Sequence, residues 1–224
     1  MKGKHHLAAC LLGTILLSVS GSSLQAQNES SKKSILSVNV GPSWYVGRFM
    51  GITDHADSYR NDLRKGVSWQ ASCWYAGKGY GHKGLTIGPG FIYQGSSYRE
   101  TRENGSDKIG MHYLAPQLGA FFFLNRYMVQ LSTGVGYQFY SDKSTVYDKP
   151  RDVSMNKLAC NLSLNGEYFL TEQWGISARL NWIFSKSERY SVEYHGQYWQ
   201  VEHPQTGEGY FGQLSLLFGL NYHF

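Results

Sequence analysis

A regular alternation of apolar and polar residues at the C-terminal end of the chain restricts its fold more than any other feature. Between Tyr210 and Phe224 every second residue is apolar or aromatic apart from one glycine, and the intervening residues are mainly small or polar. Successive side chains of a β-strand point to opposite faces, so this spacing predicts a strand with one apolar and one polar face. A tilted strand of about ten residues is long enough to cross the hydrocarbon layer of a membrane.

The same alternation recurs in seven further segments. These segments are 35–49, 66–76, 84–98, 110–124, 127–141, 156–170 and 174–189. Together with the terminal segment they predict an all-β fold, an eight-stranded antiparallel transmembrane β-barrel with up-and-down meander topology, in one domain over residues 35–224. Proline removes a donor from the β-ladder, so we expect a local bulge or a missing hydrogen bond at Pro42, Pro89 and Pro116.

The connections between these segments alternate in length. Residues 50–65, 99–109, 142–155 and 190–208 form long, polar connections, and residues 77–83, 125–126 and 171–173 form short ones. An even-stranded membrane barrel with both termini on the inner side has four long outer loops and three short inner turns. The connections therefore predict which end of the barrel faces outward.

Aromatic residues, 15% of the chain, sort by depth along the predicted strands. The outward rings near the short turns are Tyr75, Phe122, Tyr127, Tyr168, Trp174, Tyr222 and Phe224. The outward rings near the long connections are Trp44, Trp69, Tyr93, Tyr137, Phe139, Trp182, Phe184 and Tyr210. Two aromatic belts around an aliphatic band are typical of a protein that spans a membrane. A soluble β-sandwich also alternates but has no reason to sort its rings in this way.

The N-terminal end predicts secretion. Residues 1–26 have a short basic start, an apolar run and small residues before Gln27, as a cleaved signal peptide does. Residues 27–34 then form a short periplasmic segment. Removal of the signal peptide takes away two lysines and no acids, so the net charge falls from +5 to +3, which is too small to predict nucleic-acid binding. Cys73 and Cys160 remain, and we expect two free thiols because they lie on opposite walls, facing lipid.

Several short stretches resemble a known group of proteins. They are Gln27 after the predicted cleavage site, Val38-Asn39-Val40-Gly41, Tyr113-Leu114-Ala115-Pro116-Gln117-Leu118 and the terminal strand ending in Phe224. The chain resembles small outer-membrane barrels of the OmpA and OmpX group and, more narrowly, the PorT-like barrels common in Bacteroidetes. The resemblance covers the whole mature chain through loose motifs. It implies an outer-membrane location and no single activity, with no catalytic residues to carry over.

The same resemblance implies partners. The terminal aromatic Phe224 on an amphipathic strand is similar to the signal read by the machinery that inserts barrels into the outer membrane. Outer-membrane lipid and lipopolysaccharide would surround the inserted barrel. No cofactor is expected.

Polar residues occupy the predicted inner face. They include Gln70, Gln117, Gln130, Asn161, Asn165, Glu167, Arg179, Asn181 and Asn221. Glu167 and Arg179 lie on neighbouring strands at similar distances from the turn at 171–173, so we predict that they pair in the lumen. The interior of an eight-stranded barrel is nearly filled by side chains, so a structural plug is favoured over a gate in a pore.

The fourth long connection is the preferred binding candidate. It carries Tyr194, Tyr198 and Trp199 in a polar stretch, with Tyr190 nearby. Exposed aromatic rings with polar neighbours suit contact with an extracellular glycan or protein. The alternative is that these rings pack on one another or extend the outer belt.

These observations predict a non-enzymatic barrel with a structural, adhesive or recognition role exerted through its four outer loops. A lipid A deacylase or acyltransferase is one alternative, because a Ser–His–acid set activates a serine nucleophile. The residues available for such a set are His55 with Asp54 and Ser58, and His195 or His203 with Glu193 or Glu202. None of them forms a recognisable motif, and no histidines or cysteines show metal-ligand spacing. A narrow small-solute channel is the other alternative.

Overall fold

The computed structural model describes residues 34–76, 84–103, 105–187, 189–202 and 209–224. The predicted signal peptide, residues 27–33, the short turn at 77–83 and His203 lie outside the described residues, whereas Ser34 begins the first strand. The elements are β1 (Ser34–Gly47), α2 (Asp57–Leu63), β2 (Lys65–Tyr75), β3 (Gly84–Arg102), β4 (Gly105–Leu124), β5 (Tyr127–Val146), β6 (Lys149–Phe169), β7 (Trp174–Lys186), β8 (Arg189–Tyr194), β9 (Gln197–Glu202) and β10 (Tyr210–His223). Within the described part of the chain, no helix is long and apolar enough to cross a membrane.

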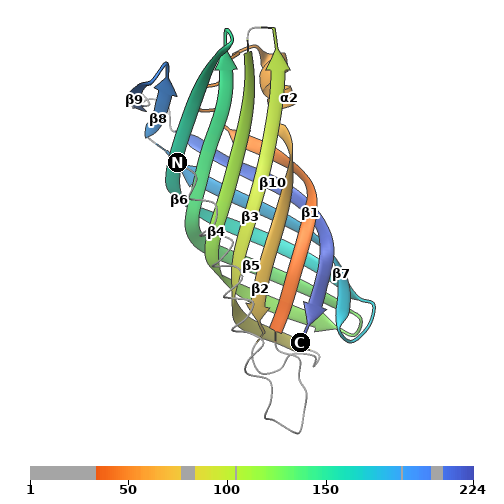
Figure 1. Ribbon diagram of the computed structural model, residues 1–224. Helices are drawn as coiled ribbons and strands as arrows, with labels where there is room; N and C mark the ends of the chain where they lie inside the picture. The colour runs from red at the N-terminus through yellow and green to blue at the C-terminus, as the bar shows by residue number, and fades with distance from the viewer. Residues whose placement is uncertain (1–33, 77–83, 104, 188, 203–208) are drawn as a thin grey trace. The chain divides into compact units, whose positions relative to one another are not determined.

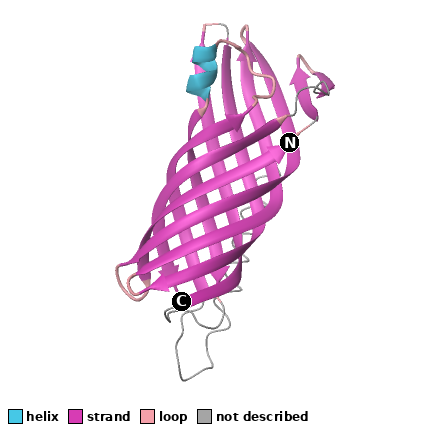
Figure 2. Cartoon of the chain, turned by 180° about the vertical axis from the view of Figure 1, so that it is seen from behind, coloured by secondary structure: helices cyan, strands magenta, loops and turns pink. Residues whose placement is uncertain are grey.

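Eight of the strands close into a ring. The hydrogen-bonded order is β5-β4-β3-β2-β1-β10-β7-β6, and pairing of β5 with β6 closes it (Figures 1 and 2). Every neighbouring pair is antiparallel. The predicted eight-stranded antiparallel barrel is therefore confirmed. The strands β8 and β9 lie outside the ring as a hairpin. β8 pairs with residues 151–154 near the N-terminal end of β6, and β9 pairs with β8.

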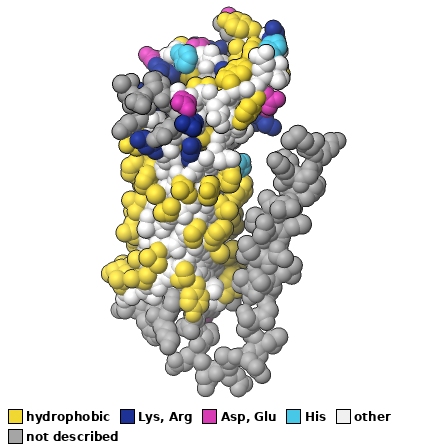
Figure 3. Space-filling view, turned by 90° about the vertical axis from the view of Figure 1, so that its left-hand side faces the viewer, with side chains coloured by type: hydrophobic (Ala, Val, Ile, Leu, Met, Phe, Trp, Pro, Cys, Tyr) yellow, Lys and Arg dark blue, Asp and Glu magenta, His cyan; other side chains and the backbone are white. Residues whose placement is uncertain are grey.

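The two faces of the barrel have opposite character. Outward aliphatic side chains are exposed, for example Val38 at 61% and Leu158 at 63%, whereas inward amides such as Gln70 and Asn181 are buried. Figure 3 shows the resulting hydrophobic band on one side of the barrel. All the rings assigned to the two aromatic belts lie on the outer face. Since a soluble protein buries its apolar face, this inverted arrangement is that of a barrel surrounded by lipid.

The prolines leave the strand register intact. Pairing of β1 with β10 has the same register at Val40↔Phe218 and Ser43↔Ser215, on either side of Pro42. Around Pro116 the β4–β5 register is likewise the same before and after a two-residue interruption of the ladder. Pro89 immediately precedes Gly90, the residue of β3 at which pairing with β2 ends. The prolines thus interrupt the ladder locally and insert no extra residue, the second of the two predicted outcomes.

Two of the four predicted long loops are wrong. β3 and β4 pair as far as Arg102↔Gly105, and β5 and β6 pair as far as Val146↔Lys149. Tyr147 and Asp148 between the latter have positive φ angles of 48° and 62°, as a two-residue hairpin turn requires. Beyond the membrane the outward face of these strands meets water and becomes polar, so the alternation that marks a membrane strand fades although the strand continues.

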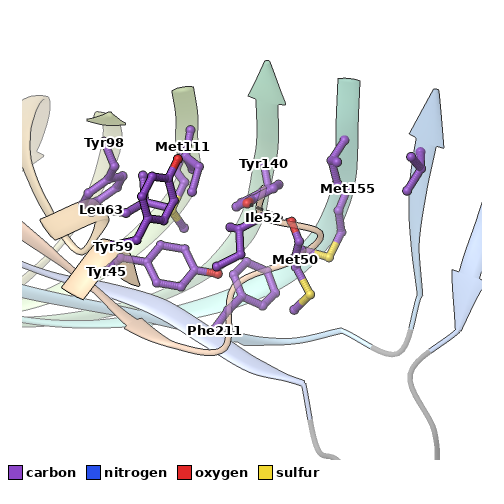
Figure 4. Close-up of a cluster of buried hydrophobic side chains, with 13 residues drawn as sticks. Tyr45, Met50, Ile52, Tyr59, Leu63, Tyr98, Met111, Tyr140, Met155 and Phe211 are labelled. Atoms are coloured by element: carbon purple, nitrogen blue, oxygen red, sulfur yellow. Dashed lines mark hydrogen bonds between the residues drawn. The ribbon is translucent and has the colours of Figure 1, made fainter. Parts of the chain in front are cut away.

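The lumen is filled in layers. At the end with the short turns an apolar cluster includes Trp74 and Phe121, whose rings meet edge to face. At the opposite end a larger cluster, here called the mouth cluster, closes the barrel. The mouth cluster consists of Tyr45, Met50, Ile52, Tyr59, Leu63, Tyr98, Ile109, Met111, Tyr140, Val153, Met155, Val192 and Phe211 (Figure 4). Polar side chains occupy the space between.

The first long connection contributes to the mouth cluster. Residues 50–65 were expected to be an outer loop, but Met50, Ile52, Tyr59 and Leu63 are 0–5% exposed. Tyr59 and Leu63 are one turn apart on α2, so they share the face that points into the barrel. The loop therefore caps the lumen.

Candidate functional site

A buried arginine organises the middle of the lumen. Arg179 on β7 is 1% exposed. Its guanidinium donates hydrogen bonds to Gln70 Oε1 at 2.6 Å, Ser72 Oγ at 3.3 Å and Gln130 Oε1 at 3.3 Å. These acceptors come from strands on different sides of the barrel. Because an unpartnered buried charge is costly, the arginine draws these strands together across the lumen.

An amide network continues from this point toward the mouth. Gln94 Oε1 accepts from Gln70 at 3.0 Å and from Asn181 at 2.7 Å. Asn181 Oδ1 accepts from Asn161 at 3.1 Å, and Asn161 Oδ1 accepts from Gln117 at 2.8 Å. The chain of hydrogen bonds links β3, β7, β6 and β4, and it occupies the space that a pore would need.

The predicted Glu167–Arg179 pair is not formed. In the β6–β7 register Glu167 lies opposite Ser177, and Arg179 lies opposite Asn165. Glu167 instead accepts from Asn221 and contacts the His223 ring, both on β10. The turn is the reason: it spans residues 170–173, where the Thr171 hydroxyl accepts from the Gln173 and Trp174 amides. This geometry moves the centre of the β6–β7 hairpin toward β6. Glu167 therefore pairs with Ser177, two residues before the Arg179 that was predicted.

A second buried charged group lies at the mouth, and the sequence analysis missed it. Asp107 on β4 is 0% exposed. Its Oδ2 accepts from the Thr53 amide at 2.9 Å, the Thr53 hydroxyl at 2.7 Å and the Tyr59 hydroxyl at 2.8 Å. Arg151 reaches Oδ1 at 3.3 Å. This carboxylate therefore holds the first connection and α2 in the mouth of the barrel.

Asp142 on β5 adds a second acid to this group. It is 0% exposed, and its Oδ1 accepts from the Lys108 amide at 3.0 Å. Burial, and next the nearby charge of Asp107, raise the pKa of Asp142 to about 8. Burial also raises the pKa of Tyr59, so that its hydroxyl remains a donor to Asp107. In the sequence, Asp107 lies just before the predicted strand 110–124 and Asp142 lies just after the predicted strand 127–141. Both acids occupy inward positions if these strands are extended, and this was the signal that could have revealed the group.

The fourth connection is built as the hairpin β8–β9. Val192 packs in the mouth cluster, and Tyr190 and Val201 pack against it. The pairs Val192↔Trp199 and Tyr194↔Gln197 place Tyr194 and Trp199 on that same face. Tyr198 pairs with Glu193 and points to the opposite face. The three predicted binding residues therefore do not form one surface.

The outer face of the hairpin carries a shallow pocket. Pro150, Asp152, Glu193, His195 and Gly196 line a cavity of about 260 Å³. Asp152 and Glu193 lie directly opposite each other in the β6–β8 register. Tyr198, which is 65% exposed and donates to Ser191 Oγ at 2.6 Å, stands beside it.

Of the residues proposed for an enzymatic set, Glu193 and His195 line the same pocket, whereas His55, Asp54 and Ser58 do not join one another. Asp54 accepts from the Ala56 amide at 2.8 Å, and the Ser58 hydroxyl accepts from Arg102 at 2.7 Å. Within the described residues His55 forms no hydrogen bond with either side chain. His195 makes an edge-to-face contact with Tyr194. Among the described residues, no group of three or more His, Cys, Asp or Glu could hold a metal ion.

The two cysteines are free, as predicted: Cys73 is exposed on β2, and Cys160 is partly exposed on β6.

A closed ring of eight antiparallel strands with a lipid-facing apolar band and a polar lumen defines a small transmembrane β-barrel of the outer-membrane type. No protein-family model matches the chain, and no curated protein sequence matches it either.

Solved structures of three outer-membrane proteins share this fold. Neisserial surface protein A is 8% identical, with a TM-score of 0.55, and the match covers 85% of this chain and 97% of that one. A major outer-membrane protein of Thermus thermophilus is 16% identical, with a TM-score of 0.54 and coverage of 85% and 99%. The outer-membrane protease OmpT of Escherichia coli is 10% identical, with a TM-score of 0.52 and coverage of 89% and 99%. At these identities the likeness concerns the fold alone.

Proposed function

We propose that the protein is a closed barrel of the bacterial outer membrane that recognises an extracellular glycan or protein without catalysing a reaction. The end that carries the β8–β9 hairpin faces outward in this proposal, and residues 1–26 act as the signal peptide. The exposed Phe224 at the C-terminal end would be read by the insertion machinery. Membership of the PorT-like barrels is part of the same proposal and is supported by the sequence stretches named above.

The outer face of the sheet β6–β8–β9 carries the proposal. Closure of the ring does not use β8 or β9, yet the chain builds them and leaves β9 almost wholly exposed. The pocket beside Tyr198 combines two carboxylates, an imidazole and an aromatic ring. Carboxylates accept hydrogen bonds from hydroxyl and ammonium groups, and an exposed ring supplies apolar contact. This combination suits sugar hydroxyls or a basic side chain of a protein ligand.

The filled lumen supports a role at the surface rather than in solute passage. The mouth cluster, the amide network and the apolar cluster at the opposite end follow one another along the axis of the barrel. In planar bilayers we expect no steady conductance. A stable, concentration-dependent conductance of the purified barrel would refute the closed lumen.

Recognition is tested with the barrel in lipid nanodiscs applied to arrays of glycans and extracellular-matrix proteins. Tyr198→Ala and Glu193→Gln should each abolish a signal that the native barrel gives. Tyr147→Ala is the matched control, because Tyr147 is a tyrosine of similar exposure, 71%, at the β5–β6 turn. Native binding that survives both hairpin substitutions would contradict the proposed surface.

A further inference from the structure

Three basic residues stand side by side on the outward face of the barrel near its mouth. Arg99 on β3 lies directly opposite Lys108 on β4. The β4–β5 register, given by Ser106↔Thr145 and Ile109↔Asp142, places Lys108 opposite Lys143. All three side chains are exposed. Residues directly opposed in a sheet have Cβ atoms about 5 Å apart, so three positive charges share a small area on adjacent strands.

This row lacks the close partners, a carboxylate or an aromatic ring, that two other basic residues near the mouth have. Lys65 pairs with Asp62 at 3.1 Å, and the Lys186 ammonium lies 5.9 Å from the Tyr210 ring centre. None of Arg99, Lys108 and Lys143 lies within 4 Å of an acid among the described residues, although Asp152 on β6 lies directly opposite Lys143 on β5. Like charges directly opposed across strands are destabilising unless an anion lies between them.

Below the row, toward the hydrophobic band, the outward side chains are small, and we infer a recess in the surface from them. The next outward residues on the same three strands are Ser97, Gly110 and Ser141, which the register places in one line. A Cβ added at Gly110 would meet nothing closer than the Ser141 carbonyl oxygen at 3.9 Å. The recess therefore has an open floor at the glycine, a hydroxyl on each side and three cations along its upper edge.

Next toward the membrane lies the outer aromatic belt. His112 and Tyr93 stack there, with the Tyr93 hydroxyl 2.9 Å from His112 Nδ1, and Leu114 and Tyr137 follow on the neighbouring strands. Lys108 is four residues beyond His112. At about 3.3 Å per residue and a tilt of about 40°, the row lies about 10 Å beyond the belt, near the outer limit of the lipid headgroups. Figure 3 shows Lys and Arg side chains at this level, directly above the hydrophobic band.

We propose that Arg99, Lys108 and Lys143, with the recess at Gly110, bind the phosphate group of a phosphorylated lipid in the outer leaflet. Basic side chains and serine hydroxyls are donors that phosphate oxygens accept. The acyl chains of the same molecule extend down the barrel wall over Leu114 and the aromatic belt. This site adjoins the pocket on the β6–β8–β9 surface, because Lys143 lies opposite Asp152, but it uses other residues and does not depend on the function proposed for that surface.

The test measures binding of phosphorylated lipid A to the purified full-length barrel by native mass spectrometry, with enzymatically dephosphorylated lipid A as the second probe. The native barrel should prefer the phosphorylated form. The triple variant Arg99→Gln, Lys108→Gln, Lys143→Gln should bind it on the order of a hundredfold more weakly, since a basic residue near an anionic lipid surface contributes about fivefold. Gly110→Leu should weaken binding without any change of charge, because it fills the recess.

The triple variant Arg48→Gln, Lys149→Gln, Lys186→Gln removes the same charge from other exposed positions and should bind as the native barrel does. Heat-dependent gel mobility verifies that every variant is folded. Equal affinity of the native barrel for the two lipid forms would overturn the proposal. So would equal losses in the two triple variants, which would mean a general effect of net charge, or unchanged binding by Gly110→Leu.

Discussion

The buried acids Asp107 and Asp142 at the mouth predict that the equilibrium between closed and open positions of the first connection, residues 50–65, depends on pH. In the closed structure Asp142 is fully buried beside Asp107, the carboxylate that holds this connection through Thr53 and Tyr59, and its pKa is about 8. If residues 50–65 move out, water reaches Asp142 and its pKa returns toward the ordinary value of 3.8. The closed form then binds one proton more than the open form between these two values.

The sign and size follow from this difference. The pKa of Asp142 is higher in the closed form than in the open form. The contribution of Asp142 to the stability of the closed form is therefore complete below about pH 4, decreases as the pH rises and levels off above about pH 8. Each pH unit in this window lowers the free energy of opening by about 1.4 kcal/mol, which is a tenfold change in the opening equilibrium. Between pH 5 and pH 8 the total is at most about 4 kcal/mol.

Asp142→Asn should remove this dependence. The amide oxygen of the variant still accepts from the Lys108 amide, its NH₂ group donates toward Asp107, and the side chain does not ionise. The measurement is hydrogen exchange of peptides from 50–63, corrected for the intrinsic pH dependence of exchange. The native barrel should open more readily toward pH 8 and then reach a plateau, and the variant should stay flat.

Asp148→Asn is the control for this experiment. Asp148 is an exposed acid at the β5–β6 turn, so its loss should leave the native pH profile unchanged. A flat native profile between pH 5 and pH 8, or the same slope in the native barrel and Asp142→Asn, would refute the reasoning.

Three further predictions concern the barrel wall and lumen. Arg179→Met should lower stability to urea by about 1–3 kcal/mol for each acceptor left without a donor, Gln70 among them, as read from the folded band on unheated gels. Glu167→Ala should also destabilise the barrel in the same assay, because it removes the acceptor shared by two β10 side chains; native-like stability would count against that role. Alkylation of the denatured, unreduced protein should label both Cys73 and Cys160, and no labelling would reveal a disulfide.

Local patterns were sufficient to predict the strands and the direction of their side chains. The alternation from Tyr210 to Phe224 identified β10 and its lipid-facing side, and the same rule separated Gln70 and Asn181 from the outward leucines. Each residue of a strand reports its own side through backbone geometry, whatever lies opposite. The same rule, together with the order of the strands, was sufficient to predict that Cys73 and Cys160 are free thiols.

The ends of the strands needed more than alternation. β3 to β6 continue beyond the hydrocarbon layer, where an outward residue such as Lys108 no longer faces acyl chains and both faces can be polar. The pattern then no longer distinguishes a strand from a loop. In the first connection, the spacing of Tyr59 and Leu63 was the readable signal of a buried helical face, but it lay among charged residues.

The sequence by itself thus determined a barrel, its inside and outside, and its aromatic belts. Only the tertiary structure decided which side chains meet: Glu167 with β10 instead of Arg179, Asp107 with Thr53 and Tyr59, and Arg99 beside Lys108. Such contacts depend on strand register and on closure of the ring. A turn longer by one residue slides every pair along two strands, and no local pattern within either strand records that shift.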